Sequence, residues 1–358
     1  MKTFHCDRCN QQVFFENTRC ENCAGMLGYE PERREINTYE PTEDGLWRSL
    51  NEKSPYRIYK QCINYSREDV CNWMLPASEN HELCSSCRLT HIIPALSSEK
   101  NRLYWKRLEA AKRRLLYSLW ELHLQPTPKL EDPQAGLAFE FLEDTPEQRV
   151  ITGHSNGLIT LNIAEADPAH REKTREQMHE PYRTLLGHFR HESGHYYFDQ
   201  LIAGSRWLEP FRELYGDERM DYGQALQRHY DDGPAADWDQ RFISAYASSH
   251  PWEDWAESWA HYLHMIDTLD TAFHCGIAAR PKKASEPEMV IEEKPAHSEA
   301  FVDMMSNWFA LTYVLNSLNR SIGMPDAYPF ALSPLVIRKL EFIHQVVLGK
   351  REEERNQG

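Results

Sequence analysis

Residues 185–202 read LLGHFRHESGHYYFDQLI and place two histidines, His191 and His195, four positions apart. On a helix such side chains share a face and differ by about 40° in azimuth, so both imidazoles can reach one metal ion while Glu192 projects beside it. Apolar residues flank the motif and no proline falls between residues 182 and 203, which favours a helix. This stretch therefore predicts a helix that carries a catalytic zinc site.

Gly194 stands inside this predicted helix. Glycine costs a helix interior about 1 kcal/mol relative to alanine. That cost is easier to understand if another backbone or the metal site must approach closely at this position. Packing alone is a second explanation, and both stay open.

A third zinc ligand is expected downstream, because catalytic zinc sites use three protein ligands and keep one position open. Residues 250–261 read HPWEDWAESWAH, in which Pro251 suits a first helical turn. Glu253 and Glu257 then lie one turn apart on one face, while the tryptophans of another face should form core. We predict Glu253 as the third ligand and Glu257 as the carboxylate that orients a zinc-bound histidine. The reverse assignment stays open.

His188 is a competing ligand, since it lies one turn before His191 on the same helical face. Three ligands on one straight helix fit a tetrahedron poorly. We therefore prefer to interpret His188 as a buried, hydrogen-bonded histidine near the site.

The cysteines are concentrated at one end of the chain, with eight of the nine between Cys6 and Cys87. In a reducing compartment two sets of four thiols indicate metal binding, whereas the lone Cys275 is interpreted as a core thiol. The first set is a pair of C-x2-C turns typical of a zinc ribbon, and the second has this spacing only in its last pair. We predict one structural zinc in each set: Cys6, Cys9, Cys20 and Cys23, and then Cys62, Cys71, Cys84 and Cys87.

Composition excludes several classes of protein. The chain has 358 residues, 41% of them hydrophobic, and a formal net charge of −15. It can therefore bury a core, and it does not have the basic surface expected of a general nucleic-acid binder. No window approaches the roughly 18 apolar residues of a membrane span, and the first residues lead into no apolar segment. We expect a cytoplasmic protein with no membrane partner and no nucleic-acid partner.

The remainder of the chain is expected to be mostly helical. Residues 97–124 have the pattern of an amphipathic helix, and we interpret the run Lys112-Arg113-Arg114 as its solvated face. Strand composition appears near residues 136–142 and 158–163, and two helices are expected near 299–319 and 333–349.

The motifs together resemble a known family. An N-terminal zinc ribbon, GHFRHESGHYY at residues 187–197 and HPWEDWAE at residues 250–257 are similar to the bacterial zinc-binding metallopeptidases with a zinc-ribbon N-terminus. Further matching stretches are CNW at residues 71–73, GHSNGLIT at 153–160 and GDERMDY at 216–222. The resemblance covers nearly the whole chain to about residue 345, and it implies a gluzincin-like fold and metal site without supplying a substrate.

This resemblance implies an α+β fold class that is mostly helical. We expect a zinc-ribbon domain with two four-cysteine sites over residues 1–97, a zincin-like metallopeptidase domain with a small sheet over 98–350, and a polar tail over 351–358. By analogy with that fold alone, the strand at 158–163 is expected to present an edge to which an extended peptide adds.

A wider similarity to gluzincins such as anthrax lethal factor implies one more role. In those enzymes a tyrosine seven residues before the ligand glutamate stabilises the oxyanion, and Tyr246 precedes Glu253 by that interval. A purely structural aromatic is the alternative interpretation of Tyr246.

The expected function is zinc-dependent peptide hydrolysis. A catalytic zinc would lower the pKa of its bound water toward about 7, and Glu192 would accept the proton as general base and pass it to the departing amine. The expected partners are a peptide or protein substrate and a protein that docks on the zinc ribbon. The alternative is a zinc-stabilised scaffold or adaptor whose ribbons recruit a partner while the peptidase domain is idle or highly selective.

Overall fold

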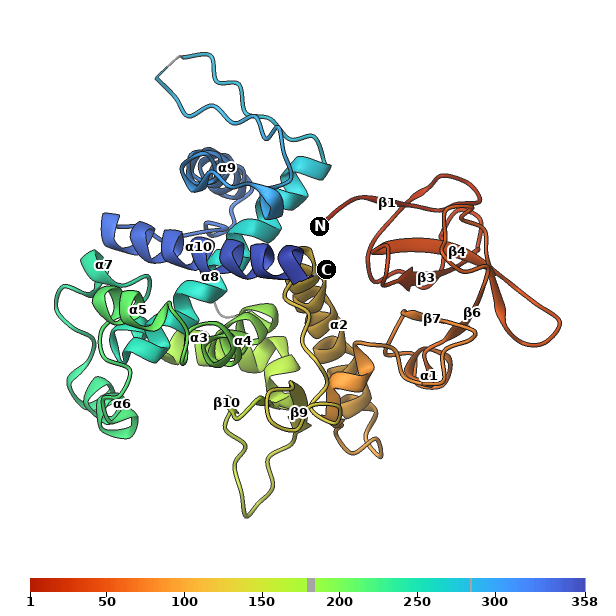
Figure 1. Ribbon diagram of the computed structural model, residues 1–358, viewed down its shortest axis with the longest axis horizontal. Coiled ribbons are helices and arrows are strands. Elements are labelled where there is room, and N and C mark those ends of the chain that lie inside the picture. The colour runs from red at the N-terminus through yellow and green to blue at the C-terminus, as the bar shows by residue number, and fades with distance from the viewer. Residues whose placement is uncertain (179–183, 284, 358) are drawn as a thin grey trace. The chain divides into compact units, whose positions relative to one another are not determined.

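The computed structural model describes residues 1–178, 184–283 and 285–357 (Figure 1). The chain divides into two compact units. One comprises Met1, residues 118–125 and residues 174–358, and the other comprises residues 2–117 and 126–173. The structure has mostly helices with small sheets, as the sequence predicts. The domain boundary at residues 97 and 98 stays a prediction.

The second unit begins with the cysteine-rich segment, which forms two antiparallel sheets. A hairpin of β1 (Phe4–His5) and β2 (Gln12–Val13) precedes a five-stranded sheet. The strands of that sheet lie in sequence order: β3 (Met26–Glu30), β4 (Glu35–Pro41), β5 (Trp47–Ser49), β6 (Ile58–Gln61) and β7 (Met74–Pro76). A short helix, α1 (Ile63–Ser66), separates the last two strands.

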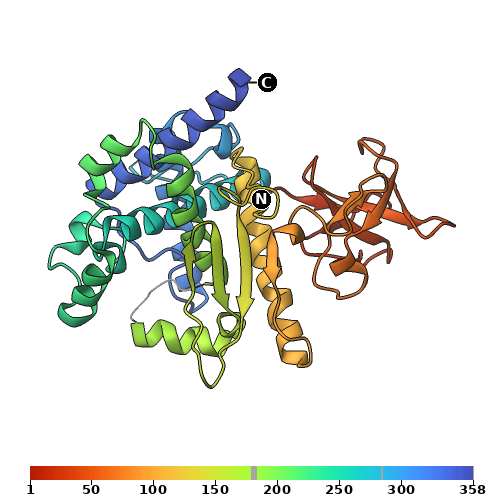
Figure 2. The same cartoon turned by 60° about the horizontal axis from the view of Figure 1, so that its bottom comes forward.

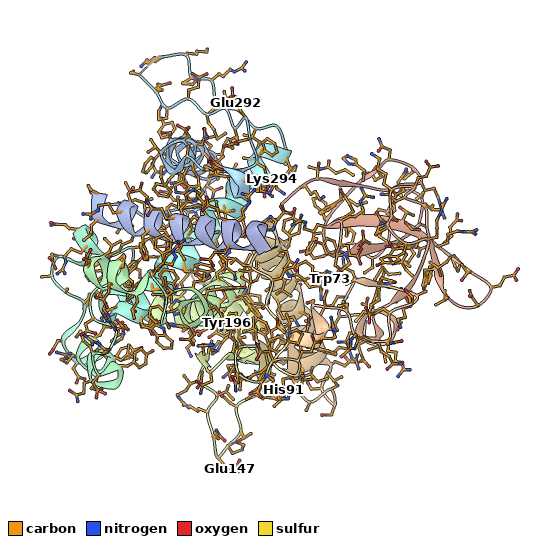
Figure 3. The ribbon with its side chains drawn as sticks, viewed as in Figure 1. Trp73, His91, Glu147, Tyr196, Glu292 and Lys294 are labelled. Atoms are coloured by element: carbon orange, nitrogen blue, oxygen red, sulfur yellow. The ribbon has the colours of Figure 1, made fainter. Side chains whose placement is uncertain are left out.

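Aromatic side chains fill the interior of this segment. Tyr29 packs on Trp73 with ring centroids 4.8 Å apart, and Tyr39 packs on Tyr59 at 5.4 Å. Trp73 is labelled in Figure 3. All four are buried, and each covers far more apolar area than an aliphatic side chain would. A segment of this length is too short to bury a larger apolar core. The rest of its folding stability must therefore come from other interactions within the segment.

The rest of the second unit is a small sheet with helices (Figure 2). A 3-10 turn, Cys87–Leu89, leads into β8 (Thr90–Ile92), and long helix α2 (Glu99–Glu121) follows. The sheet is completed by β9 (Ala138–Leu142), β10 (Gly153–Ser155) and β11 (Leu158–Asn162), in the order β10-β11-β9-β8. A 3-10 turn, Ile163–Ala166, and the part of α3 (Pro168–Met178) up to residue 173 close the unit.

The expected edge strand at residues 158–163 is not an edge. Strand β11 pairs in parallel with β9 on one side and antiparallel with β10 on the other. Asn156 and Gly157 join β10 to β11 with positive φ values of 48° and 74°, the backbone that a two-residue hairpin turn requires. That turn folds β10 back over the side of β11 that a peptide would have needed, so the expectation was wrong.

The basic run of α2 is not a solvated face either. Lys112 is 0% exposed and Arg113 is 4% exposed, and only Arg114 faces solvent. The Lys112 Nζ lies 2.9 Å from a Glu109 carboxylate oxygen that is equally buried, and it also donates to the Thr90 hydroxyl. The helix is buried on nearly every side between Tyr104 and Leu122, so charged residues inside it are paired instead of hydrated.

The first unit is built around one long helix, α8 (Pro251–His274). Around it are α4 (Leu185–Leu201), α5 (Leu208–Tyr215), α6 (Tyr222–Asp232), α7 (Trp238–Arg241), a 3-10 turn at Tyr246–Ser248, another at Pro295–His297, α9 (Phe301–Ser321) and α10 (Pro334–Gln357). Helices α9 and α10 confirm the two helices expected near 299–319 and 333–349.

Helix α8 forms the core of this unit. Its residues Trp255, Trp259 and Leu263 are 0% exposed, because other helices cover α8 along most of its length. Lys339 of α10 reaches into the core and lies 2.5 Å from the Asp254 carboxylate, a buried ion pair that fixes the two helices against each other. The tryptophan face predicted to form core does so.

Two further observations concern single features of the chain. Cys275 ends helix α8 and is exposed, so its interpretation as a core thiol was wrong; it follows the last buried turn of the helix. No helix in the described parts of the chain is both long and apolar enough to cross a membrane.

Candidate metal centres

Helix α4 presents the HESGH motif from its middle. The helix begins after Thr184, whose side chain accepts a hydrogen bond of 2.9 Å from the Gly187 N–H, and it continues unbroken to Leu201. His195 is 3% exposed, and the side chain of His191 is 15% exposed. Both imidazoles are therefore held in the protein interior, and His191 is the one nearer to solvent.

Helix α8 supplies the carboxylates from its first two turns. Pro251 is its first residue, and the preceding His250 accepts a 3.1 Å hydrogen bond from the Trp252 N–H through Nδ1. Glu253 is 1% exposed and the side chain of Glu257 is 21% exposed. The helix starts where the sequence predicts, and this start brings both carboxylates to the face that meets α4.

The two helices cross closely at Gly194. A methyl group at this position would lie 2.9 Å from the Ala256 Cα atom and 3.2 Å from the Trp259 side chain. The Gly194 carbonyl accepts a 2.8 Å hydrogen bond from the Trp255 indole, and the Ser193 hydroxyl accepts one of 3.2 Å from the Trp259 indole. Close approach of another backbone, one of the two explanations considered for this glycine, is confirmed.

The substitution Gly194→Ala tests this crossing. Alanine favours the helix by about 1 kcal/mol, but overpacking a dense core costs about 1–3 kcal/mol, so we expect a net loss of stability. Urea unfolding of the zinc-loaded protein measures it. Gly223 of α6 is the matched control, because a methyl group there meets nothing closer than 3.6 Å and Gly223→Ala should leave stability unchanged or higher. Equal behaviour of the two variants would contradict the close crossing.

The crossing brings three ligand atoms to one point. The Nε2 atoms of His191 and His195 lie 3.2 Å apart, and Glu253 Oε2 lies 3.0 Å from the first and 3.5 Å from the second. A tetrahedral zinc site with bonds of about 2.0–2.1 Å has ligand atoms about 3.3 Å apart, so the spacing fits that ion. Glu253 Oε2 is buried and makes no well-oriented hydrogen bond within the described chain. The donor set and this buried oxygen fit a zinc ion.

Other side chains orient these ligands. Glu257 Oε1 lies 2.7 Å from His191 Nδ1, so that nitrogen carries the proton and the Nε2 lone pair faces the cluster. The Ser244 hydroxyl donates a 2.6 Å hydrogen bond to the other oxygen of Glu257. This geometry favours Glu253 as ligand and Glu257 as the orienting carboxylate over the reverse assignment.

The charges of the cluster favour a cation at its centre. Burial by itself would lower the pKa of His191, but its close contacts with the carboxylates of Glu253 and Glu257 outweigh burial and raise that pKa well above its usual value. Burial would raise the pKa of Glu253, yet attraction to His195 and His191 lowers it well below the usual value. Positive charge is therefore stabilised where the three ligand atoms meet.

Glu192 is a buried carboxylate of the same helix, α4. It follows His191 on α4, is 6% exposed, and its Oε2 atom has no hydrogen-bond partner among the described residues. An ionisable oxygen that is buried without a partner is costly, and such groups are typical of reactive sites. Glu192 is not among the three residues whose ligand atoms converge.

The two remaining sequence candidates lie near the cluster in different ways. Tyr246 is half-buried, and its ring centroid lies 6.1 Å from that of His191. Burial first, and then the negative charge of Glu253, raise the pKa of Tyr246, which keeps its phenol protonated. His188 is half-buried on α4 and is not part of the converging set found in the described chain.

Tyr222 and Ser244, which donate hydrogen bonds to the carboxylates of Glu253 and Glu257, were not predicted as site residues. The Tyr222 hydroxyl donates a 2.6 Å hydrogen bond to Glu253 Oε1, and Ser244 holds Glu257 as described above. Tyr222 ends the matching stretch at residues 216–222, which was the only available signal for it. Nothing in the spacing of Ser244 distinguishes it from other serines.

The eight N-terminal cysteines form two further clusters. In the first, the Cys6 and Cys23 sulfurs and the Cys9 and Cys20 sulfurs are each 3.6 Å apart; in the second, those of Cys71 and Cys84 are 3.7 Å apart. A disulfide requires about 2.05 Å, whereas zinc–sulfur bonds of about 2.3 Å place sulfurs about 3.8 Å apart. None of the nine cysteines, all of which are described, forms a disulfide. Both sets therefore fit tetrahedral thiolate metal sites.

The second thiolate cluster is fully enclosed. Its members Cys62, Cys71, Cys84 and Cys87 are all buried. Arg113 of α2 donates a 2.9 Å hydrogen bond to the Val70 carbonyl beside it. Burial would lower the pKa of Arg113, but attraction to Cys71 and Glu109 outweighs burial and raises it. A buried guanidinium thus balances the negative charge that four thiolates around zinc would carry.

Comparison with known proteins gives two family matches, which cover successive parts of the chain. The family model described as "Putative zinc-binding metallo-peptidase" matches residues 101–346, and one described as "zinc-ribbon domain" matches residues 3–98. Uncharacterized protein Mb2598c of Mycobacterium bovis and Uncharacterized protein Rv2568c of Mycobacterium tuberculosis are each 44% identical over 349 residues, which is 97% of this chain and 95% of each relative. No solved structure matches the chain.

Proposed function

Because the chain belongs to the zinc-binding metallopeptidase family, with a zinc-ribbon domain at its N-terminal end, we propose that it hydrolyses peptide bonds at the cluster of His191, His195 and Glu253. The observation that supports this proposal best is the convergence of these three ligand atoms, with the buried Glu192 next to the ligand His191 in the sequence. Three protein ligands leave a fourth position open, which separates a catalytic zinc site from a closed structural one.

The proposed chemistry assigns a step to each residue. Held by His191, His195 and Glu253, a zinc ion would supply Lewis-acid chemistry and would lower the pKa of a water molecule toward about 7. Glu192 accepts a proton from the attacking water and delivers it to the nitrogen of the departing amine. The protonated phenol of Tyr246 donates a hydrogen bond to the oxyanion of the tetrahedral intermediate. Glu257 holds His191 in the tautomer that ligation needs. This arrangement is of the gluzincin type.

The proposal extends to metal content and to partners. We propose three zinc ions per chain, one catalytic and two structural, because the described residues form one histidine–glutamate cluster and two cysteine clusters. The cysteine sites use all four protein ligands and therefore have a structural role. The substrate is a peptide or protein, and the zinc ribbon is proposed to dock a protein partner.

The proposal is tested with the zinc-loaded, full-length protein and a library of peptides of mixed sequence. Mass spectrometry should detect new termini that disappear when a chelator removes the weakest-held zinc and return when zinc is added back. Reappearance of the same cleavage sites separates this peptidase from a contaminant. If no peptide in a broad library is cleaved and a stable partner is captured through the intact ribbon but not by Cys6→Ser, the scaffold function would replace the peptidase function.

A further inference from the structure

Tyr222 engages one oxygen of the ligand carboxylate and leaves the other free. Its hydroxyl donates a 2.6 Å hydrogen bond to Glu253 Oε1, while Oε2 faces the Nε2 atoms of His191 and His195 at 3.0 and 3.5 Å. The two oxygens of one carboxylate therefore have different neighbours. Attraction between the phenol and the carboxylate is a charge-assisted hydrogen bond, which is stronger than a neutral one.

Because its two oxygens have different contacts, the Glu253 carboxylate is limited in the number of coordination positions that it can occupy on a metal ion. A carboxylate binds a metal through one oxygen or through both. Binding through both would require Oε1 to turn toward the ion and to leave the Tyr222 hydroxyl. If that hydrogen bond holds Oε1 away, Glu253 would present only Oε2 to the ion, and the protein would contribute three ligand atoms in all. One coordination position then remains for water or substrate.

The position of Tyr222 is itself fixed by the surrounding chain. It is the first residue of α6, after Asp221, whose side chain accepts a 2.8 Å hydrogen bond from the Gln224 N–H. Its ring packs on His250 and Trp252, at centroid distances of 5.3 and 5.7 Å. The hydroxyl that contacts Glu253 therefore comes from a third segment, α6, which lies between α4 and α8 in the sequence.

This segment is tied to the start of α8 as well. His250 Nε2 donates a 3.1 Å hydrogen bond to the Met220 carbonyl, two residues before Tyr222. The residue that caps α8 thus also holds the stretch of chain that leads into α6.

We propose that Tyr222 is a positioning residue that restricts Glu253 to one ligand atom and so keeps a coordination position of the catalytic metal open. This role rests on the proposed metal site, and it does not require that the substrate be a peptide. A merely structural hydrogen bond would affect stability but not the number of ligands around the ion.

The test compares Tyr222→Phe with the wild-type protein. The two thiolate clusters keep their zinc, the third site is emptied with a chelator, and Co²⁺ is added back as a spectroscopic probe. We expect the visible absorption of four-coordinate Co²⁺ in the wild-type protein and a weaker band from a higher coordination number in the variant, because both carboxylate oxygens can then bind. Zinc affinity, measured against a chromophoric chelator, should fall by about 10–100-fold.

Two further variants separate this role from general disturbance of the site. Tyr313→Phe makes the same chemical change on α9 at an exposed position and should alter neither readout. Ser244→Ala removes the donor to Glu257 rather than to Glu253, so it should weaken zinc binding without changing the Co²⁺ band. Wild-type affinity and spectrum in Tyr222→Phe would overturn the proposal.

Both readouts are independent of peptide cleavage. If no substrate is cleaved but the Co²⁺ band changes in Tyr222→Phe, the proposed function fails while the positioning role stands. If peptides are cleaved but the band is the same in both proteins, the reverse holds. Circular dichroism of Tyr222→Phe should match that of the wild-type protein, because the residue is 38% exposed and keeps its ring.

Discussion

Replacing Glu192 with glutamine is expected to reduce peptide hydrolysis by about 10²–10⁴-fold, the contribution typical of a general base. Glutamine keeps the shape of the side chain, but its amide cannot accept and then return a proton. The carboxylate is not one of the three converging ligands, so zinc content should remain that of the wild-type protein. Initial rates on a cleaved peptide, measured together with zinc per chain, decide between the two effects.

A matched control removes the same negative charge elsewhere. Glu43 is exposed in the cysteine-rich segment, and Glu43→Gln should keep full activity and full zinc content. Unchanged turnover in Glu192→Gln would remove Glu192 from the mechanism. Loss of zinc from Glu192→Gln would instead mean that Glu192 helps to hold the ion, and the role of general base would then need another residue.

The largest change in metal content is expected for His191→Ala. Three clusters in the described chain fit a metal, and this substitution removes one of three ligands from the cluster that has the fewest. We expect three zinc ions per chain to fall to two, with hydrolysis lost and the fold retained. Elemental analysis of the purified protein counts the zinc, and circular dichroism follows the helices.

The matching control for this variant is His188→Ala on the same helix. It should keep three zinc ions, because the three converging ligand atoms come from other residues. Loss of one zinc ion from His188→Ala with none lost from His191→Ala would reverse the ligand assignment. Retention of three ions in both variants would mean that this cluster does not hold zinc.

The part of the site that could be predicted follows from the spacing of residues along single helices. The spacing of His191 and His195, and of Glu253 and Glu257, defines which side chains share a face of one helix. Gly194 at a helical position indicated, as one of two explanations, a close approach of another backbone, and its position lies against the Ala256 Cα atom. Patterns of this kind involve residues only one or two helical turns apart, so they can be recognised without knowledge of the tertiary fold.

Features that depend on distant segments could not be predicted in this way. Lys112 and Arg113 carry charges that normally indicate a solvated face, but partners from other segments, such as Thr90 and Val70, allow their burial. Tyr222 reaches Glu253 across 31 positions of sequence, and no periodicity encodes that contact. The edge of the small sheet was mistaken for the same reason, since a strand's neighbours are decided by pairing and not by its composition.

The convergence of His191, His195 and Glu253 also has a topological consequence. An ion shared by α4 and α8 joins positions 195 and 253 and closes the intervening chain into a loop, much as a covalent cross-link would. For a loop of that length, chain-entropy estimates assign a cross-link about 4 kcal/mol at 25 °C. Chelation would remove that link, and because the ion binds the folded unit and not the unfolded chain, its availability would govern how long the helical unit resists unfolding and degradation.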